Sequence, residues 1–146
     1  TRNGRAVKFH EQDVRTMGRT ATGVRGVRLR EDSVVGMEEA YDEHDLLTVT
    51  ENGFGKRTVI SEYRLIARGG KGVRNIKVTE KNGKVIGVKA VQSGDEILCI
   101  TDKGQVIRMG VNGISQIGRN TRGVRLVRLR EGDKVAHVSK VAQENE

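Results

Sequence analysis

Thr50-Glu51-Asn52-Gly53 is one of three copies of a turn-like sequence, and its recurrence decides the fold. The other two copies are Thr1-Arg2-Asn3-Gly4 and Thr101-Asp102-Lys103-Gly104. Further along each copy, the Gly-Val-Arg at 72–74 aligns without a gap with the same tripeptide at 23–25 and 123–125. A period of about fifty residues indicates an array in which each repeat is one supersecondary unit. We call residues 1–45, 46–96 and 97–141 units one, two and three, and residues 142–146 the tail.

Unit two contains four segments that have the character of strands. Residues 46–50 and 56–60 flank Asn52-Gly53, a dipeptide that favours a type I′ hairpin turn with positive φ at both central residues. After a longer connection, residues 73–79 alternate apolar and polar side chains, as a half-buried strand does. Asn82-Gly83 predicts a second hairpin, and residues 85–91 form its return strand. The sequence therefore predicts an all-β array of three four-stranded antiparallel blades, similar to part of a propeller.

Three blades do not usually close a ring, so we do not expect a complete propeller. Thr1 aligns with the end of the strand at 46–50, so the chain begins inside a unit and unit one lacks its first strand. We expect a fragment of a longer array with one unpaired edge. An exposed edge of this kind can pair with another chain, so self-association is predicted.

The composition favours an anionic partner. The net charge is +8 and the sequence pI is about 10.0, values that favour binding to nucleic acid, with a soluble basic surface as the alternative. The single cysteine, Cys99, lies in an apolar run, which predicts a buried thiol and a reducing compartment. The absence of a long apolar stretch and of a signal-peptide pattern predicts a cytoplasmic protein with no membrane partner.

Acidic and basic residues are separated along the chain. Residues 16–30, 63–79 and 103–130 contain arginine and lysine but no acid, whereas acids gather at 38–45 and at 95–96. Because the units stack in register, we expect the three basic segments to form one band along an edge of the array. Three positions are basic in every unit: 19/68/119, 25/74/125 and 28/77/128.

Two interpretations compete for these basic positions. Arg28, Lys77 and Arg128 alternate with apolar residues and could be a solvated strand face. The loop arginines have glycine neighbours, which allow the backbone to approach a phosphate, so we favour phosphate binding there. The candidate DNA-binding residues are Arg19, Arg25, Arg28, Lys56, Arg57, Arg68, Lys71, Arg74, Lys77, Arg108, Arg119, Arg122, Arg125 and Arg128.

The aromatic content favours duplex over single-stranded nucleic acid. The chain has two tyrosines, two phenylalanines and no tryptophan, too few to stack unpaired bases. A basic band without stacking groups suits the backbone of a duplex. Bending a duplex around the band would cost roughly 1–6 kcal/mol per site of 20–30 base pairs, which electrostatic attraction must exceed.

No pattern in the chain is typical of a catalytic or metal site. His10, His44 and His137 occupy unrelated places in the repeat and lack partners at ligand spacing. Residues 113–118 are one residue too long for a nucleophile elbow. Gly70-Lys71 is followed by glycine rather than serine or threonine, so it is not a P-loop.

Several of these segments resemble the C-terminal domain of the bacterial DNA gyrase A subunit. They include Asn52-Gly53-Phe54-Gly55-Lys56-Arg57-Thr58, Gly72-Val73 with Ile76-Lys77-Val78-Thr79-Glu80, and Gly118-Arg119-Asn120-Thr121 with Gly123-Val124. Val14-Arg15-Thr16-Met17-Gly18 leading into Thr22-Gly23-Val24-Arg25-Gly26 is similar too. The resemblance covers essentially the whole chain and recurs in all three units.

This resemblance implies a fold, a function and partners. The fold would be the last three blades of a six-bladed β-pinwheel whose basic outer rim wraps duplex DNA, enabling negative supercoiling by the holoenzyme. The module itself would need no cofactor, whereas the holoenzyme would use ATP and Mg. Its partners would be duplex DNA, the remainder of the gyrase A subunit, and the gyrase B subunit, in the bacterial cytoplasm at the nucleoid.

The match to the family's motifs is incomplete. Its signature heptapeptide, Gln-Arg-Arg-Gly-Gly-Lys-Gly, belongs to the first blade, whereas residues 66–72 match only its last five positions in what should be the fifth blade, so we interpret them as the equivalent loop and not as the signature. Neither Tyr41 nor Tyr63 lies in a motif for DNA cleavage, so no catalysis is expected from this piece alone. Of the family's acidic tail, only Glu144 and Glu146 remain. The matching domain of topoisomerase IV and a propeller-type protein-interaction module, using the acidic segment 38–45, are the alternatives.

Overall fold

The computed structural model describes residues 1–143, which contain β-strands and three short 3-10 turns but no α-helix. The all-β prediction is therefore confirmed. The elements are β1 (Arg5–Ala6), η1 (Glu11–Asp13), β2 (Asp45–Thr50), β3 (Phe54–Val59), η2 (Ile60–Glu62), β4 (Val73–Arg74), β5 (Val85–Val91), β6 (Glu96–Thr101), β7 (Val106–Gly110), η3 (Val111–Gly113), β8 (Val124–Arg125) and β9 (Val135–Lys140). Glu144 and Glu146, interpreted above as the remainder of an acidic tail, lie outside the described residues.

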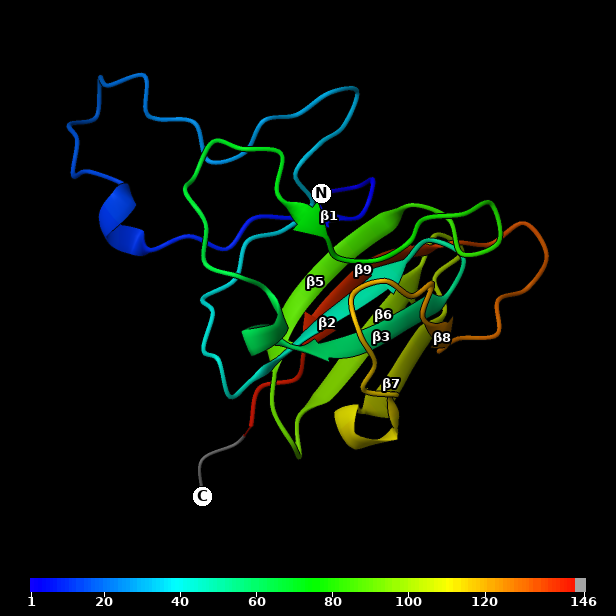
Figure 1. The fold of residues 1–146 in the computed structure, drawn as a ribbon. Coiled ribbons are helices and arrows are strands. Elements are labelled where there is room, and N and C mark those ends of the chain that lie inside the picture. Colours follow the sequence, from blue (N-terminus) through cyan, green and yellow to red (C-terminus); the bar gives the residue numbers. More distant parts are fainter. Residues whose placement is uncertain (144–146) are drawn as a thin grey trace.

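Two antiparallel sheets form the body of the molecule (Figure 1). One has the strand order β5-β2-β3-β8, and the other has the order β7-β6-β9. The central pairs are equivalent: β2 pairs with β3 from Asp45↔Val59 to Val49↔Gly55, and β6 pairs with β7 from Glu96↔Gly110 to Ile100↔Val106. The repeat in the sequence is thus a repeat in strand register.

The first turn of each unit is not the type I′ turn that Asn52-Gly53 favoured. Gly53 N donates to Thr50 O over 3.1 Å, so Glu51 and Asn52 are the central residues. Gly53 has a φ of 82°, whereas Asn52 is not among the residues with positive φ. Glycine therefore follows the turn as a bulge residue, where only the absence of a Cβ permits the conformation.

The short strand of each unit pairs with the unit that precedes it. In unit two the predicted strand at 73–79 is reduced to β4, which pairs with β1 of unit one. In the same way, β8 of unit three pairs with β3 of unit two. The ladder stops after two residues because Asn75 N and Ile76 N both donate to one carbonyl, Gly4 O, at 2.7 and 3.2 Å. Neighbouring units are therefore joined by strand exchange.

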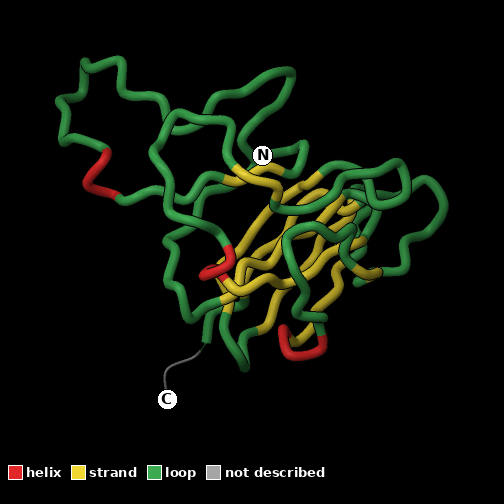
Figure 2. The backbone as a smooth tube through the Cα atoms, viewed as in Figure 1, coloured by secondary structure: helices red, strands yellow, loops and turns green. Residues whose placement is uncertain are grey.

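Unit one has less regular structure than the other two. Residues 34–40 align with β5, but they form no strand, and β1 together with β4 gives only a two-stranded sheet. Figure 2 shows the resulting contrast between the long loops on one side and the strands on the other. Unit one has no strand equivalent to β2, as expected, and among residues 1–143 only the sheet built on unit two has four strands, because β8 of unit three pairs with β3 and leaves the β7-β6-β9 sheet with three.

The core lies between the two larger sheets. Leu47, Val49, Ile97 and Cys99 are fully buried there, together with Val138 at 3% exposure. A Cβ on Gly87 in β5 would lie 2.8 Å from Val138 Cγ1 in β9. This close approach of the inner strands fixes the spacing between units two and three and so positions their outer loops.

Candidate nucleic-acid interface

The three basic segments lie next to one another. Arg28 N donates to Gly70 O over 2.8 Å, and Lys77 N donates to Thr121 O over 2.9 Å. Figure 1 shows these loops in succession, from the blue and cyan loop of unit one through the green loop of unit two to the orange loop of unit three. Backbone bonds between successive units therefore bring together the basic positions that are far apart in the sequence.

A subset of the basic side chains in these loops is well placed for an anionic ligand. We call this subset the basic band. Its members are solvent-exposed, and within residues 1–143 none of them forms a salt bridge; they are Arg25, Arg28, Arg74, Lys77, Arg122, Arg125 and Arg128. Arg19 and Lys71 are also exposed and lie on the adjoining loops.

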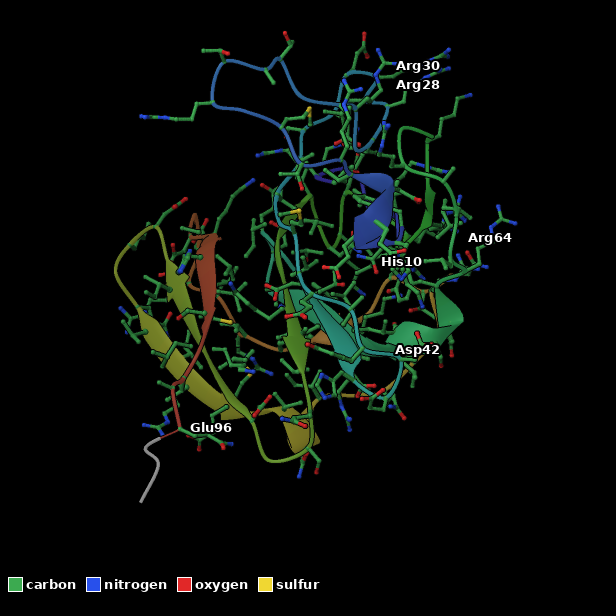
Figure 3. The ribbon with its side chains drawn as sticks, turned by 90° about the vertical axis from the view of Figure 1, so that its left-hand side faces the viewer. His10, Arg28, Arg30, Asp42, Arg64 and Glu96 are labelled. Carbon is green, nitrogen blue, oxygen red and sulfur yellow. The ribbon has the colours of Figure 1, made fainter. Side chains whose placement is uncertain are left out.

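Many acidic side chains lie away from this band, but Asp32 lies beside it, in one cleft lining with Arg28, Arg74 and Lys77. Figure 3 shows Arg28 and Arg30 at one end of the molecule, with Asp42 and Glu96 toward the other. Several acids are also neutralised locally: Lys8 Nζ lies 2.6 Å from Asp42 Oδ1, and Lys89 Nζ lies 3.7 Å from Glu38 Oε1. Asp32 apart, the clusters of acids at 38–45 and 95–96 are therefore separated from the basic band in space as well as in sequence.

Lys56, one of the predicted DNA-binding residues, lies in the interior. Its side chain has no exposed surface, and its ammonium donates to Gly118 O at 2.6 Å and Arg119 O at 3.0 Å. Burial lowers the pKa of Lys56 to about 8, against an ordinary value of 10.5. The prediction that Lys56 contacts DNA is therefore wrong. The Lys56 ammonium holds the loop of unit three from the protein interior and cannot reach a ligand.

Arg57 and Arg108 occupy equivalent positions and are held within their own sheets. Arg57 Nη1 lies 2.8 Å from Asp45 Oδ2, and its Nε donates to Ile114 O over 2.7 Å. Arg108 forms an ion pair with Glu96 and remains largely exposed. These pairings hold the two guanidinium groups against carboxylates, so both are weaker candidates for ligand contact than the basic band.

Two of the loop arginines that are basic in every unit join one unit to the next. Arg68 Nη1 donates to Arg25 O, and Arg119 Nη1 donates to Arg74 O, both over 3.0 Å. Arg68 Nε also donates to Asp13 O over 2.8 Å. Each arginine thus spans the junction with the preceding unit through backbone carbonyls. The arginine fork, which lysine lacks, allows Arg68 to reach two carbonyls at once.

Two arginines that the sequence reasoning did not select contribute to this surface. Arg5 and Arg30 line a cleft of about 480 Å³ between units one and two, together with Arg28, Lys71, Arg74 and Lys77. Arg5 was missed because the equivalent residue in unit two is Phe54, and Arg30 because Thr79 replaces it there. Both arginines face basic residues of the following unit. A search for basic residues at the contact between successive units, in addition to positions that are basic in every unit, would have found them.

Other reactive side chains are buried or isolated. Burial raises the pKa of Cys99 to about 11 and that of Tyr63 to about 12, and the Tyr63 hydroxyl is bonded to Asn75. Among residues 1–143, no three histidine, cysteine or acidic side chains gather as a metal site would require. The described part of the chain also contains no helix with the length and apolarity to cross a membrane.

Comparison with known proteins gives consistent matches over the whole chain. The family described as "DNA gyrase C-terminal domain, beta-propeller" matches residues 1–38, 44–92 and 95–142. The DNA gyrase A subunit of Staphylococcus epidermidis is 44% identical over 149 residues, covering 100% of this chain and 17% of the relative. The same protein of Klebsiella oxytoca is 48% identical over 141 residues, covering 96% of this chain and 16% of the relative. The chain thus spans about a sixth of the length of these relatives.

Solved structures give the same result. A structure described as the DNA gyrase A C-terminal domain superposes with a TM-score of 0.85 at 32% identity, covering 97% of this chain and 48% of that one. The C-terminal domain of DNA topoisomerase IV superposes with a TM-score of 0.89 at 26% identity, covering 96% and 44%.

Proposed function

Because this chain belongs to the DNA gyrase C-terminal domain family, we propose that it binds duplex DNA through the basic band and wraps it. The observation that supports this proposal is the row of exposed cations from three units, linked by backbone bonds and without salt bridges. Such a row matches the phosphates of a duplex, whose charge attracts lysine and arginine whatever the base sequence.

The wider context is part of the same proposal. The chain acts as one module of an ATP-dependent type II topoisomerase in the bacterial cytoplasm, and its partners are the gyrase B subunit together with the rest of the gyrase A subunit. It carries out no strand cleavage by itself. Units one to three behave together as a partial DNA-binding domain. Topoisomerase IV is the second candidate, supported by the TM-score of 0.89, but identities of 44% and 48% to gyrase relatives favour gyrase.

The test compares two double variants at equivalent positions of units two and three. Lys77→Gln/Arg128→Gln removes two cations from the basic band. Lys89→Gln/Lys140→Gln is the control. It removes two cations that lie outside the band and form salt bridges with Glu38 and Asp95. Arg68 is unsuitable for this purpose because it also joins two units.

We expect the band variant to lose about tenfold in duplex affinity and the control to change little. The slope of log affinity against log salt should fall by roughly two, because each phosphate contact contributes about 0.9. The measurement is a salt titration of binding to a fluorescent duplex. Equal slopes in the wild type and the band variant would reject the proposal.

A further inference from the structure

The cleft between units one and two concentrates positive charge in a concave site. Its volume is about 480 Å³, and its lining includes Arg5, Arg28, Arg30, Lys71, Arg74 and Lys77. Asp32 is the single acidic residue among the lining residues. Six cationic side chains against one carboxylate leave an excess of five positive charges. The volume falls within the range of about 300–1,000 Å³ that is usual for small-ligand sites.

The positive charges of the cleft are not neutralised within the protein. Arg5 lies directly opposite Arg74 in the β1–β4 pair, an arrangement of like charges that destabilises an antiparallel pair. The carboxylate of Asp32 accepts hydrogen bonds from Asn3 N at 3.0 Å and Ser33 N at 2.8 Å. Within residues 1–143, Asp32 forms no salt bridge with a cation of the cleft. An anion in the cleft would relieve the repulsion.

Part of the cleft is already ordered for binding. Arg5 donates from Nε to Lys71 O at 2.9 Å and from Nη2 to Gly72 O at 2.6 Å. These bonds fix the plane of the guanidinium group, so less side-chain entropy is lost when its remaining N–H groups bind an anion. The same two bonds hold the Lys71-Gly72 segment against β1, at the wall of the cleft.

The corresponding junction between units two and three is built differently. Phe54 takes the place of Arg5 and is 9% exposed, and the Arg125 guanidinium lies 4.9 Å from the centre of its ring. Thr79 takes the place of Arg30. We call the contact between units one and two junction one, and the contact between units two and three junction two. An aromatic ring fills the position in junction two at which junction one carries a cation, so the cationic cleft is a property of junction one.

We propose that this cleft is a binding site for linked phosphate groups, supplied either by successive phosphates of a DNA strand or by a free inorganic polyphosphate. An excess of five positive charges exceeds the one and a half to two negative charges of a single phosphate monoester at neutral pH. Linked phosphates match both the charge and the spread of the six cations over two units. The DNA source rests on the proposed function, whereas the polyphosphate source does not.

The test uses inorganic tripolyphosphate and two double variants at positions that the repeat makes equivalent. Arg28→Gln/Arg30→Gln removes two exposed cations from the cleft. Arg128→Gln/Arg130→Gln makes the same chemical change in unit three, outside the cleft lining. All four side chains are exposed, so both variants should fold, as thermal unfolding can verify. Calorimetric titration measures tripolyphosphate affinity, and a fluorescent duplex measures DNA affinity.

We expect at least a tenfold loss of tripolyphosphate affinity in the cleft variant and less than a twofold loss in the unit-three variant. If the cleft variant also loses several-fold more duplex affinity than its control, the source is the DNA strand. If duplex affinity falls equally in both, the source is the free anion. Equal losses of tripolyphosphate affinity, or no tripolyphosphate binding by the wild type, would overturn the proposal. Failure of the wild type to bind duplex would reject the proposed function alone.

Discussion

The junction between units one and two and the junction between units two and three share a backbone plan but differ in their side chains. In both, a glycine carbonyl accepts two backbone N–H groups from the following unit: Gly4 O in junction one and Gly53 O in junction two. Junction two adds the buried Lys56 ammonium and the Phe54 ring, whereas junction one has Val7 and Arg5 at these positions.

The side chains give the two junctions different chemistry. At junction two, the Phe54 ring and the Lys56 ammonium contact unit three close to the main core. At junction one, Arg5 and Arg68 bond to backbone carbonyls of the neighbouring unit, while Arg5 lies opposite Arg74 in a cationic cleft that is open to an anion. The repeated backbone bonds keep both junctions in the same geometry, so the basic loops stay in register even where the side chains repel one another.

The largest effect is expected when the shared backbone contact is broken at junction two. A Cβ on Gly53 would lie 2.5 Å from Val127 O, and the residue has a φ of 82°. Strain in the left-handed region costs about 1–2 kcal/mol, and loss of the two hydrogen bonds to Gly53 O costs about 1 kcal/mol each. We therefore expect Gly53→Ala to lower the free energy of unfolding by about 3–4 kcal/mol in urea titration.

The repeat supplies two controls for this variant. Gly104 has a φ of 84° but no atom within 4 Å of its Cβ position, so Gly104→Ala reports the backbone strain alone. Gly4→Ala would meet Ile76 O at 2.4 Å in junction one, which lies outside the main core cluster, and should release unit one without unfolding the rest. Equal losses of stability for Gly53→Ala and Gly104→Ala would mean that the contact between units contributes nothing.

A smaller effect is expected from Lys56, which has no counterpart in junction one. Lys56→Met removes the ammonium donor of Arg119 O and leaves Gly118 O with only the Thr121 hydroxyl, in a part-buried site. The expected loss is about 1–3 kcal/mol, measured by urea unfolding. Lys77→Met, at an exposed lysine, is the control and should change stability by less than about 0.5 kcal/mol.

The pKa of Lys56 adds a pH dependence of known sign. It is lowered to about 8 by burial, from 10.5, so between these values the unfolded chain binds more protons than the folded one. Stability contributed by this residue therefore rises with pH across that window. The gap between wild type and Lys56→Met should widen by on the order of 1 kcal/mol per pH unit above about pH 8. A gap that is constant with pH would contradict the burial of a charged lysine.

Most of the strand structure could be predicted from the sequence because it depends on local patterns. Alternation and turn glycines located the segments that form β2, β3, β5 and β6. Pairing of β4 and β8 with the preceding unit could not be inferred, because alternation gives a strand but not its partner. The two-residue length of β4 likewise follows from a contact with Gly4, about seventy residues away in sequence.

The candidate site was predicted less accurately, for a related reason. Lysine is usually a surface residue, and the burial of Lys56 depends on a loop of unit three that is distant in sequence. Its equivalents, Val7 and Ile107, are apolar, which was the available signal that this position points inward. Arg68 and Arg119 were selected because they recur in the repeat, but their bonds to neighbouring carbonyls show that recurrence can mark a contact between units as well as a ligand contact.

The smallest effect concerns β7, whose place in unit three is that of β3 in unit two. The outer edge of β3 is covered by β8 and by the bond from Arg57 N to Ser115 O. Within residues 1–143, β7 pairs only with β6, and Val106 at its start is 60% exposed. An uncovered edge with an exposed apolar residue is a template for pairing with a second chain.

We therefore expect weak, concentration-dependent association, detected by sedimentation velocity over a hundredfold range of protein concentration. Val106→Lys should weaken this association several-fold, corresponding to about 1 kcal/mol or less, because a charge on an edge strand opposes pairing. Val14→Lys changes a residue that is 42% exposed but lies outside any strand, and should have no effect. A monomer at every concentration would contradict pairing at this edge, and equal weakening by both variants would assign the association to general apolar contact. Weakening by Val106→Lys alone would mean that the open edge of β7 is the pairing surface. It would then correspond to the edge of β3 that pairs with β8 of unit three in junction two.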